Sequence, residues 1–181
     1  MDREEALAYL QEKVSNENLR KHCLACEAIM RRLAGRFGGD PGEWALAGLL
    51  HDVDYEAVGQ DPERHAAVGG EWLAGKGLSA EVVEAVKGHN DQAPRTGPMA
   101  RALYAVDPAS GFITACALIG REKKLAPVDL VFMQKRFKDK RFAARASREQ
   151  MAACAELGLG LDEFLFEALA AMKEISGDLG L

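Results

Sequence analysis

The sequence predicts a single all-α domain. Apolar residues recur at three- and four-residue steps through most of the chain, which is the spacing of one helix face. No stretch shows the sustained period-two alternation with β-branched residues that is typical of strands. A chain of 181 residues, of which 48% are hydrophobic and 28% charged, is expected to form one soluble globular unit with a core of its own.

Capping residues, glycines and prolines predict where the helices begin and end. Leu7, Leu10 and Val14 form one side of a short first helix, and Asn16 can cap a longer second helix. Asp40 followed by Pro41 indicates the start of a third helix, and Asp61 followed by Pro62 repeats this signal. Further helices are expected over residues 80–87, capped by Ser79, and over 99–106, 110–120, 127–137, 147–157 and 161–175, with a loop over 90–98.

The chain shows no internal repeat and no linker, so we expect one domain over residues 1–181. Its motif-bearing core covers about residues 18–107, and C-terminal helices cover 108–176. The formal net charge of −5 argues against nonspecific binding to nucleic acid or to an anionic membrane, because such binding needs a basic face. The first residues are polar, and no apolar stretch approaches the roughly 20 residues of a membrane span, so a cytoplasmic protein is expected.

The dipeptide His51-Asp52 follows an apolar helical run that contains Leu46, Leu49 and Leu50. Burying a histidine beside a carboxylate is costly unless something compensates both groups. A divalent cation bound at the helix end would do so. An ordinary buried ion pair or a capping pair is the alternative interpretation.

The chain has only four histidines, His22, His51, His65 and His89, each in its own predicted helix or at its end. Asp107 follows the apolar run 99–106. This order of His, His-Asp, His, His and Asp resembles the HD-domain superfamily of metal-dependent phosphohydrolases. His65 and His89 make it similar to the two-metal branch, and segments 64–69 and 88–90 resemble bacterial HD proteins that cleave dinucleoside tetraphosphates.

The resemblance implies a ligand set and a reaction. His22, His51, Asp52 and Asp107 would hold a first metal ion, and Asp52 would bridge to a second ion held by His65 and His89. Asp52 and His51 are then the candidate catalytic residues. The ions would share an activated hydroxide that attacks phosphorus. Iron or manganese is the expected metal, and magnesium, nickel, zinc or cobalt is also compatible with the site.

Each of these residues also has a simpler interpretation when taken alone. His22 could lie on the polar side of its helix, and His65 could be solvated in a first helical turn. His89 could interact with a helix C-terminus, and Asp107 could cap the following helix. The four cysteines include a CxxC pair, Cys23 and Cys26, which is expected to pack in the core rather than to bind zinc.

Substrate contacts are less specific in the sequence. Arg95 could bind a phosphate through two hydrogen bonds, and Asn90 could bond to substrate. Alternatively, Arg95 is a solvated loop residue and Asn90 only occupies a turn position. The basic stretch 135–148 is either a solvated face or a site for a polyphosphate or nucleotide tail. Many members of the superfamily carry a lysine three residues after the His-Asp pair. Tyr55 stands there in this chain, between Asp54 and Glu56, which predicts an acidic rim and favours a mononucleotide or small phosphoester.

The predicted function is hydrolysis of a phosphate ester or anhydride in a small metabolite or nucleotide. A di-iron oxygenase of the same fold is one alternative, because histidine and carboxylate ligands also suit iron. A nucleotide-sensing module without turnover is another. The substrate, the native metal and the oligomeric state are left open by the sequence.

Overall fold

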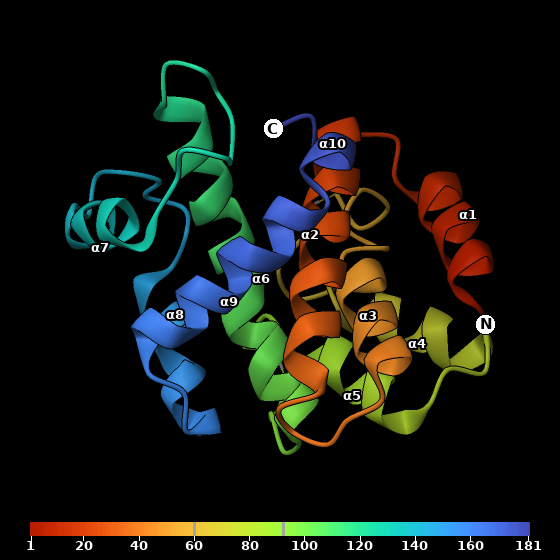
Figure 1. Ribbon diagram of the computed structural model, residues 1–181. Helices are drawn as coiled ribbons and strands as arrows, with labels where there is room; N and C mark the ends of the chain where they lie inside the picture. The colour runs from red at the N-terminus through yellow and green to blue at the C-terminus, as the bar shows by residue number, and fades with distance from the viewer. Residues whose placement is uncertain (60, 92) are drawn as a thin grey trace.

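The computed structural model describes residues 1–59, 61–91 and 93–181, and this part of the chain is all-α, with no strand. Its helices are joined by turns and loops (Figure 1). Their bounds are α1 Arg3–Lys13, α2 Glu17–Ala34, α3 Pro41–Leu50, α4 Ala67–Gly75, α5 Ala80–Gly88, α6 Pro98–Ile119, α7 Leu130–Lys138, α8 Arg148–Ala152, the 3-10 helix η1 Ala153–Leu157, α9 Leu161–Glu174 and α10 Ser176–Leu179. The predicted fold class is confirmed.

The predicted capping residues have the expected hydrogen bonds. The Asn16 side chain accepts from the backbone N–H groups of Asn18 and Leu19, and the Asp40 side chain accepts from that of Glu43. Ser79 likewise caps α5. Each side chain satisfies a backbone donor that has no partner inside its helix, so these starts are encoded locally.

Two helix predictions were wrong. Asp61 and Pro62 do not begin a helix: the Asp61 carboxylate accepts from the backbone N–H of Glu63 at 3.0 Å within a turn, and α4 starts only at Ala67. The predicted break at Asp107 is absent, because α6 runs continuously from Pro98 to Ile119 with Pro108 inside it. The loop predicted over 90–98 is confirmed for residues 90, 91 and 93–97, whereas Pro98 already begins α6, and Gln92 lies outside the described residues.

The continuous α6 also corrects the expectation that no apolar stretch has the length of a membrane span. This helix of 22 residues is long and apolar enough to cross a membrane, and 67% of its most apolar window is buried inside the fold. The core helix of a globular protein has the same properties. The helix is therefore weak evidence for a membrane span.

Close approach of α2 and α3 brings two of the candidate ligands together. A Cβ added to Gly48 would lie 2.6 Å from the carbonyl oxygen of Cys26, so only glycine allows this contact. On the other side of α2, α9 packs against both α2 and α6 and crosses them in Figure 1. The large apolar core contains residues of α2, α6 and α9, whereas a smaller one joins α1, α3 and α4. The candidate ligands come from elements that border both cores.

Candidate metal centre

His51 occupies the C-terminal cap of α3 and is fully buried. Its Nδ1 lies 2.8 Å from the carbonyl oxygen of Gly48. Because a carbonyl can only accept, Nδ1 carries the proton and donates it, and Nε2 of the neutral ring keeps a free lone pair. The last turn of α3 therefore orients the imidazole for ligation through Nε2.

His22 lies in α2 and is oriented by Ser110 of α6. The Ser110 hydroxyl donates its single proton to the carbonyl of Asp107 at 3.0 Å, so it accepts from Nδ1 of His22 at 2.7 Å. The free nitrogen of His22 is again Nε2. Ser110 lies one turn after Asp107 because α6 continues through Pro108.

His65 lies in the turn before α4, and Asp54 orients it. Nδ1 of His65 donates to Oδ1 of Asp54 at 2.8 Å, and Oδ2 of Asp54 accepts from the backbone N–H of Gly69 at 2.7 Å. The Asn90 side chain also donates to the backbone carbonyl of His65 at 2.9 Å. A Cβ at position 69 would lie 3.1 Å from the Asp54 carboxyl carbon, so glycine permits this contact.

His89 caps the C-terminus of α5, where its Nδ1 donates to the carbonyl of Val86 at 2.6 Å. All four histidines thus hold their Nδ1 protons in bonds to the surrounding protein. Their Nε2 atoms meet in two pairs, His22 with His51 at 3.1 Å and His65 with His89 at 3.1 Å. In the neutral rings these nitrogens are both acceptors, so each pair needs a shared proton or cation between its members.

The Asp52 carboxylate lies between the two imidazole pairs. Its Oδ2 is 3.5 Å from Nε2 of His22 and 3.4 Å from Nε2 of His51. Its Oδ1 is 3.2 Å from Nε2 of His65 and 3.6 Å from Nε2 of His89. Each oxygen therefore faces a different pair.

Asp107 completes the first of these groups. Its Oδ1 is 3.1 Å from Nε2 of His22 and 3.9 Å from Nε2 of His51. We call His22, His51, Asp107 and Oδ2 of Asp52 the first subsite, and His65, His89 and Oδ1 of Asp52 the second subsite. The structure brings together all six residues that the sequence singled out as metal ligands.

The electrostatics of this cluster also suit a cation. Burial raises the pKa of the Asp52 carboxyl, but the neighbouring imidazoles outweigh burial and hold that pKa well below its usual range. Burial lowers the pKa of His65, but hydrogen bonds to Asp52 and Asp54 reverse this and raise it to about 9. Burial dominates at His51, whose pKa falls to about 4. The ionised carboxylates thus attract positive charge, which protons supply when no metal does.

The donor set fits divalent ions. Two ligands at right angles with metal bonds of about 2.1 Å lie about 3 Å apart, which is close to the separations between Nε2 atoms. Imidazole nitrogens and carboxylate oxygens suit iron, manganese, zinc, nickel or cobalt. The second subsite has only three protein ligands, which leaves coordination positions for water or substrate.

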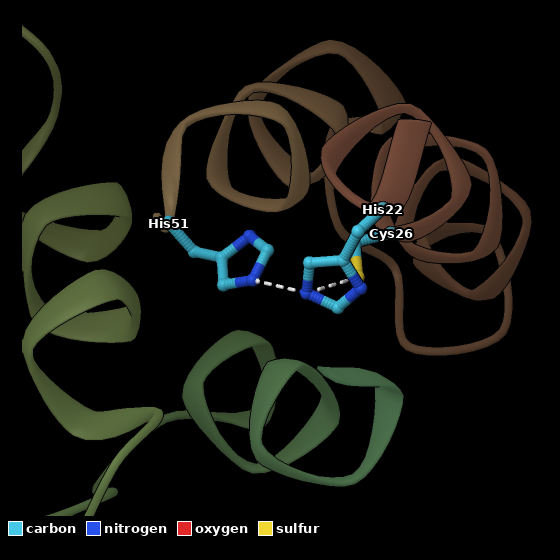
Figure 2. Close-up of side chains that lie close together, drawn as sticks. All are labelled: His22, Cys26 and His51. Carbon is cyan, nitrogen blue, oxygen red and sulfur yellow. Dashed lines mark hydrogen bonds between the residues drawn. The ribbon is translucent and has the colours of Figure 1, made fainter. Parts of the chain in front are cut away.

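Cys26 lies beside the first subsite. Figure 2 shows the imidazoles of His22 and His51 pointing toward each other, with the Cys26 sulfur next to the His22 ring. The Sγ atom is 3.9 Å from Nε2 of His22, so Cys26, His22 and His51 also form a possible ligand group. Cys23 and Cys26 are both fully buried and free of disulfides, which confirms that they pack in the core.

Replacing Cys23 and Cys26 together with alanine should leave the metal content unchanged. The first subsite already has two imidazole nitrogens and two carboxylate oxygens without a thiolate. Elemental analysis of the double variant beside each single variant tests this, and Cys23→Ala is the matched control because it removes a buried thiol outside the group. Loss of metal in the single variant Cys26→Ala, but not in Cys23→Ala, would show that Cys26 is a metal ligand.

The acidic rim that the sequence predicted at Asp54 and Glu56 does not include Asp54. Asp54 is fully buried against His65 and Gly69. The Glu56 carboxylate accepts from the backbone N–H groups of Ser15 and Asn16, ahead of α2. Asp54 is therefore not part of a solvent-facing rim, and Glu56 keeps its negative charge beside the start of α2.

The simpler interpretations also fail for two ligands. His65 is not solvated, because only 7% of it is exposed, and it precedes its helix rather than starting it. Asp107 does not cap a helix, because it lies inside α6.

The two predicted substrate contacts have structural partners. Arg95 pairs with Asp91 at 2.8 Å, and its guanidinium lies 3.7 Å from the centre of the Tyr104 ring. Asn90 supports the backbone of His65. Their roles in substrate binding stay predictions.

Asp54 and Ser110 are the orienting residues that sequence reasoning missed. No local signal distinguishes them: the sequence placed Asp54 in an acidic rim and Ser110 at the first position of a helix over 110–120. A histidine that binds metal usually donates its other N–H to a neighbouring group, so an orienting partner is expected for each one. This expectation does not say which residue the partner is.

Asp54→Asn should weaken the second subsite. The amide can turn its NH₂ toward His65, which would move the imidazole proton from Nδ1 to Nε2 and block ligation. We expect metal affinity at this subsite to fall about 10–100-fold, with the first subsite unchanged. Titration of the metal-free protein measures this, and Glu56→Gln, which removes a nearby charge that does not touch His65, should bind as wild type. Unchanged affinity in Asp54→Asn would contradict the orienting role.

The comparisons with known proteins identify partial relatives. The chain is 29% identical over 97 residues to Ribonuclease Y from Oleidesulfovibrio alaskensis, covering 53% of this chain and 18% of that protein. It is 33% identical over 72 residues to Ribonuclease Y from Cutibacterium acnes, covering 39% and 13%. The chain thus matches less than a fifth of the length of these relatives. No solved structure gives a significant match.

A family model described as HD domain matches residues 19–128, which is more than half of the chain. This range includes all six ligand candidates. HD domains bind divalent metals and are typically metal-dependent phosphohydrolases. The chain belongs to the HD domain family.

Proposed function

We propose that this protein is a two-metal phosphohydrolase that acts on a small phosphorylated metabolite or nucleotide. The observation that carries the proposal is the Asp52 carboxylate, whose two oxygens face two separate pairs of imidazole Nε2 atoms. Such an arrangement suits two ions about 3.5–4 Å apart that share one carboxylate. A single ion with only a structural role would need one of these imidazole pairs and not both.

The chain's own residues prepare the site in three ways. His51 and His89 are fixed by carbonyls of their own helices, and His65 is fixed by Asp54. Asp52 is buried and Asp107 is partly exposed beside it, and the two carboxylates supply negative charge that attracts cations, most strongly at the buried Asp52. The Ser110 hydroxyl is committed to His22 and the Asp107 carbonyl, so it orients a ligand instead of acting as a nucleophile.

A pair of divalent ions held here would lower the pKa of water and neutralise charge on phosphoryl oxygens. The protein then needs no side-chain nucleophile. Preorganised ligands reduce the rearrangement that binding and reaction would otherwise require.

Elemental analysis followed by a substrate panel tests the proposal. The purified protein is stripped with a chelator, reloaded with each candidate metal, and assayed with phosphomonoesters, phosphodiesters, nucleotides and a short RNA. Turnover of a small phosphoester or nucleotide that is lost on stripping and restored by one metal is the expected result. RNA is included because the partial relatives are named Ribonuclease Y, whereas the net charge of −5 disfavours such a substrate.

Two outcomes would contradict the proposal. Tight nucleotide binding with no turnover at any metal loading would indicate a sensing module. Oxygen consumption together with an EPR signal of mixed-valent iron would indicate an oxygenase.

A further inference from the structure

A cavity of about 350 Å³ lies against the first subsite. One side is formed by His22 and Asp107 with the next turn of α6, Pro108 and Gly111, and the other by residues 143–146 of the loop after α7. Two metal-ligand candidates therefore border an open space that the metal centre itself does not fill. This volume is near the lower end of the roughly 300–1,000 Å³ of small-molecule sites.

Apart from the two metal-ligand candidates, the lining of the cavity combines small apolar residues with one cation. Ala143, Ala144 and Ala146 contribute only methyl groups, and Gly111 would have nothing within 4 Å of an added Cβ. Arg145 is exposed, and among the described residues it has no hydrogen bond or ion pair. A guanidinium without a protein partner can bind a carboxylate or phosphate through two parallel hydrogen bonds.

Arg148 holds the loop that carries Arg145. Its guanidinium donates to the carbonyls of Phe142 at 2.5 Å, Ala143 at 2.9 Å and Ala146 at 2.7 Å. It also lies 4.8 Å from the centre of the Phe112 ring in α6. Residues on both sides of Arg145 are thus fixed to the protein core, so less conformational freedom is lost when a ligand binds.

We propose that this cavity binds the part of the substrate beyond the reacting phosphate, and that Arg145 binds a second anionic group there. Resting on the proposed function, this narrows the substrate to a small phosphorylated metabolite that carries another carboxylate or phosphate. The metal ions bind the reacting phosphate, the alanines and Gly111 leave room for a compact linking group, and Arg145 determines specificity. The proposal gives Arg145, one residue of the basic stretch 135–148, a role in ligand binding. Arg148 of the same stretch has a structural role, because it holds the loop.

Binding of a graded set of phosphonates tests the proposal. The metal-loaded full chain is titrated by calorimetry with methylphosphonate, which has one anionic group, and with phosphonoacetate and 3-phosphonopropionate, which add a carboxylate at two distances. The wild type should bind at least one carboxylated compound more tightly than methylphosphonate, by about tenfold. Arg145→Ala should lose this gain and bind methylphosphonate as wild type does.

Arg141→Ala is the matched control, because Arg141 belongs to the same basic stretch, its side chain is 97% exposed, and it does not line the cavity. It should keep the full gain. A gain that survives in Arg145→Ala would mean that the carboxylate binds the metals instead and would overturn the role of Arg145. Equal binding of all three compounds by the wild type would contradict the proposal that the cavity binds a second anionic group. Absence of any phosphonate binding would overturn the proposed function as well.

Discussion

Asp52→Ala should remove both metal ions and reduce hydrolysis by more than about 100-fold, beyond the loss expected from an outer hydrogen-bond partner. The reason is that Asp52 is the one residue shared by the two subsites, with Oδ2 toward His22 and Oδ1 toward His65. Metal content by elemental analysis and turnover of the best substrate measure the effect.

Asp107→Ala is the matched comparison, because Asp107 faces only the first subsite. It should weaken the first ion and leave the second subsite with all its ligands. Both variants should still fold, since the apolar cores of the helices are unchanged, but the melting temperature should fall with the loss of bound metal. Two equivalents of metal retained by Asp52→Ala would contradict the bridging role.

His65→Ala and His89→Ala should each reduce bound metal from two ions to about one. The first subsite keeps His22, His51 and Asp107 in both variants. Activity should fall steeply, because one ion cannot position both the attacking and the leaving oxygen. The metal stoichiometry of both variants is measured beside that of the wild type. His22→Ala weakens the other subsite, so comparing the three variants distinguishes the two ions.

Lower pH should have the same effect as these two substitutions. The pKa of His65 in the metal-free protein is raised to about 9, so a metal must displace a proton from this ring, and its apparent affinity falls as pH decreases below that value. Calorimetry in buffers of different ionisation enthalpy should show proton release on binding.

A one-metal enzyme would behave differently. In that case His65 and His89 would contact substrate or transfer protons, and the variants would keep their metal and change mainly kcat or KM. A single ion in the wild type and in both variants would exclude the two-metal assignment.

The sequence alone determined the helical class, several helix starts and the ligand candidates. Helical periodicity and caps such as Asn16, Asp40 and Ser79 are local interactions, so they can be read without the fold. The four histidines and two aspartates were recognised because their order matches a family pattern. These predictions needed no knowledge of which side chains meet.

Only the tertiary structure decided which nitrogen of each histidine is free and where a substrate could bind. His22 is oriented by Ser110, which is 88 residues away in the chain, and this contact exists because α6 continues through Pro108, where the sequence predicted a break. Packing of α6 in the core outweighed the local preference of proline. Asp54 predicted an acidic rim when read alone, yet the fold buries it beneath His65. Such contacts depend on the positions of distant segments, which local propensities do not encode.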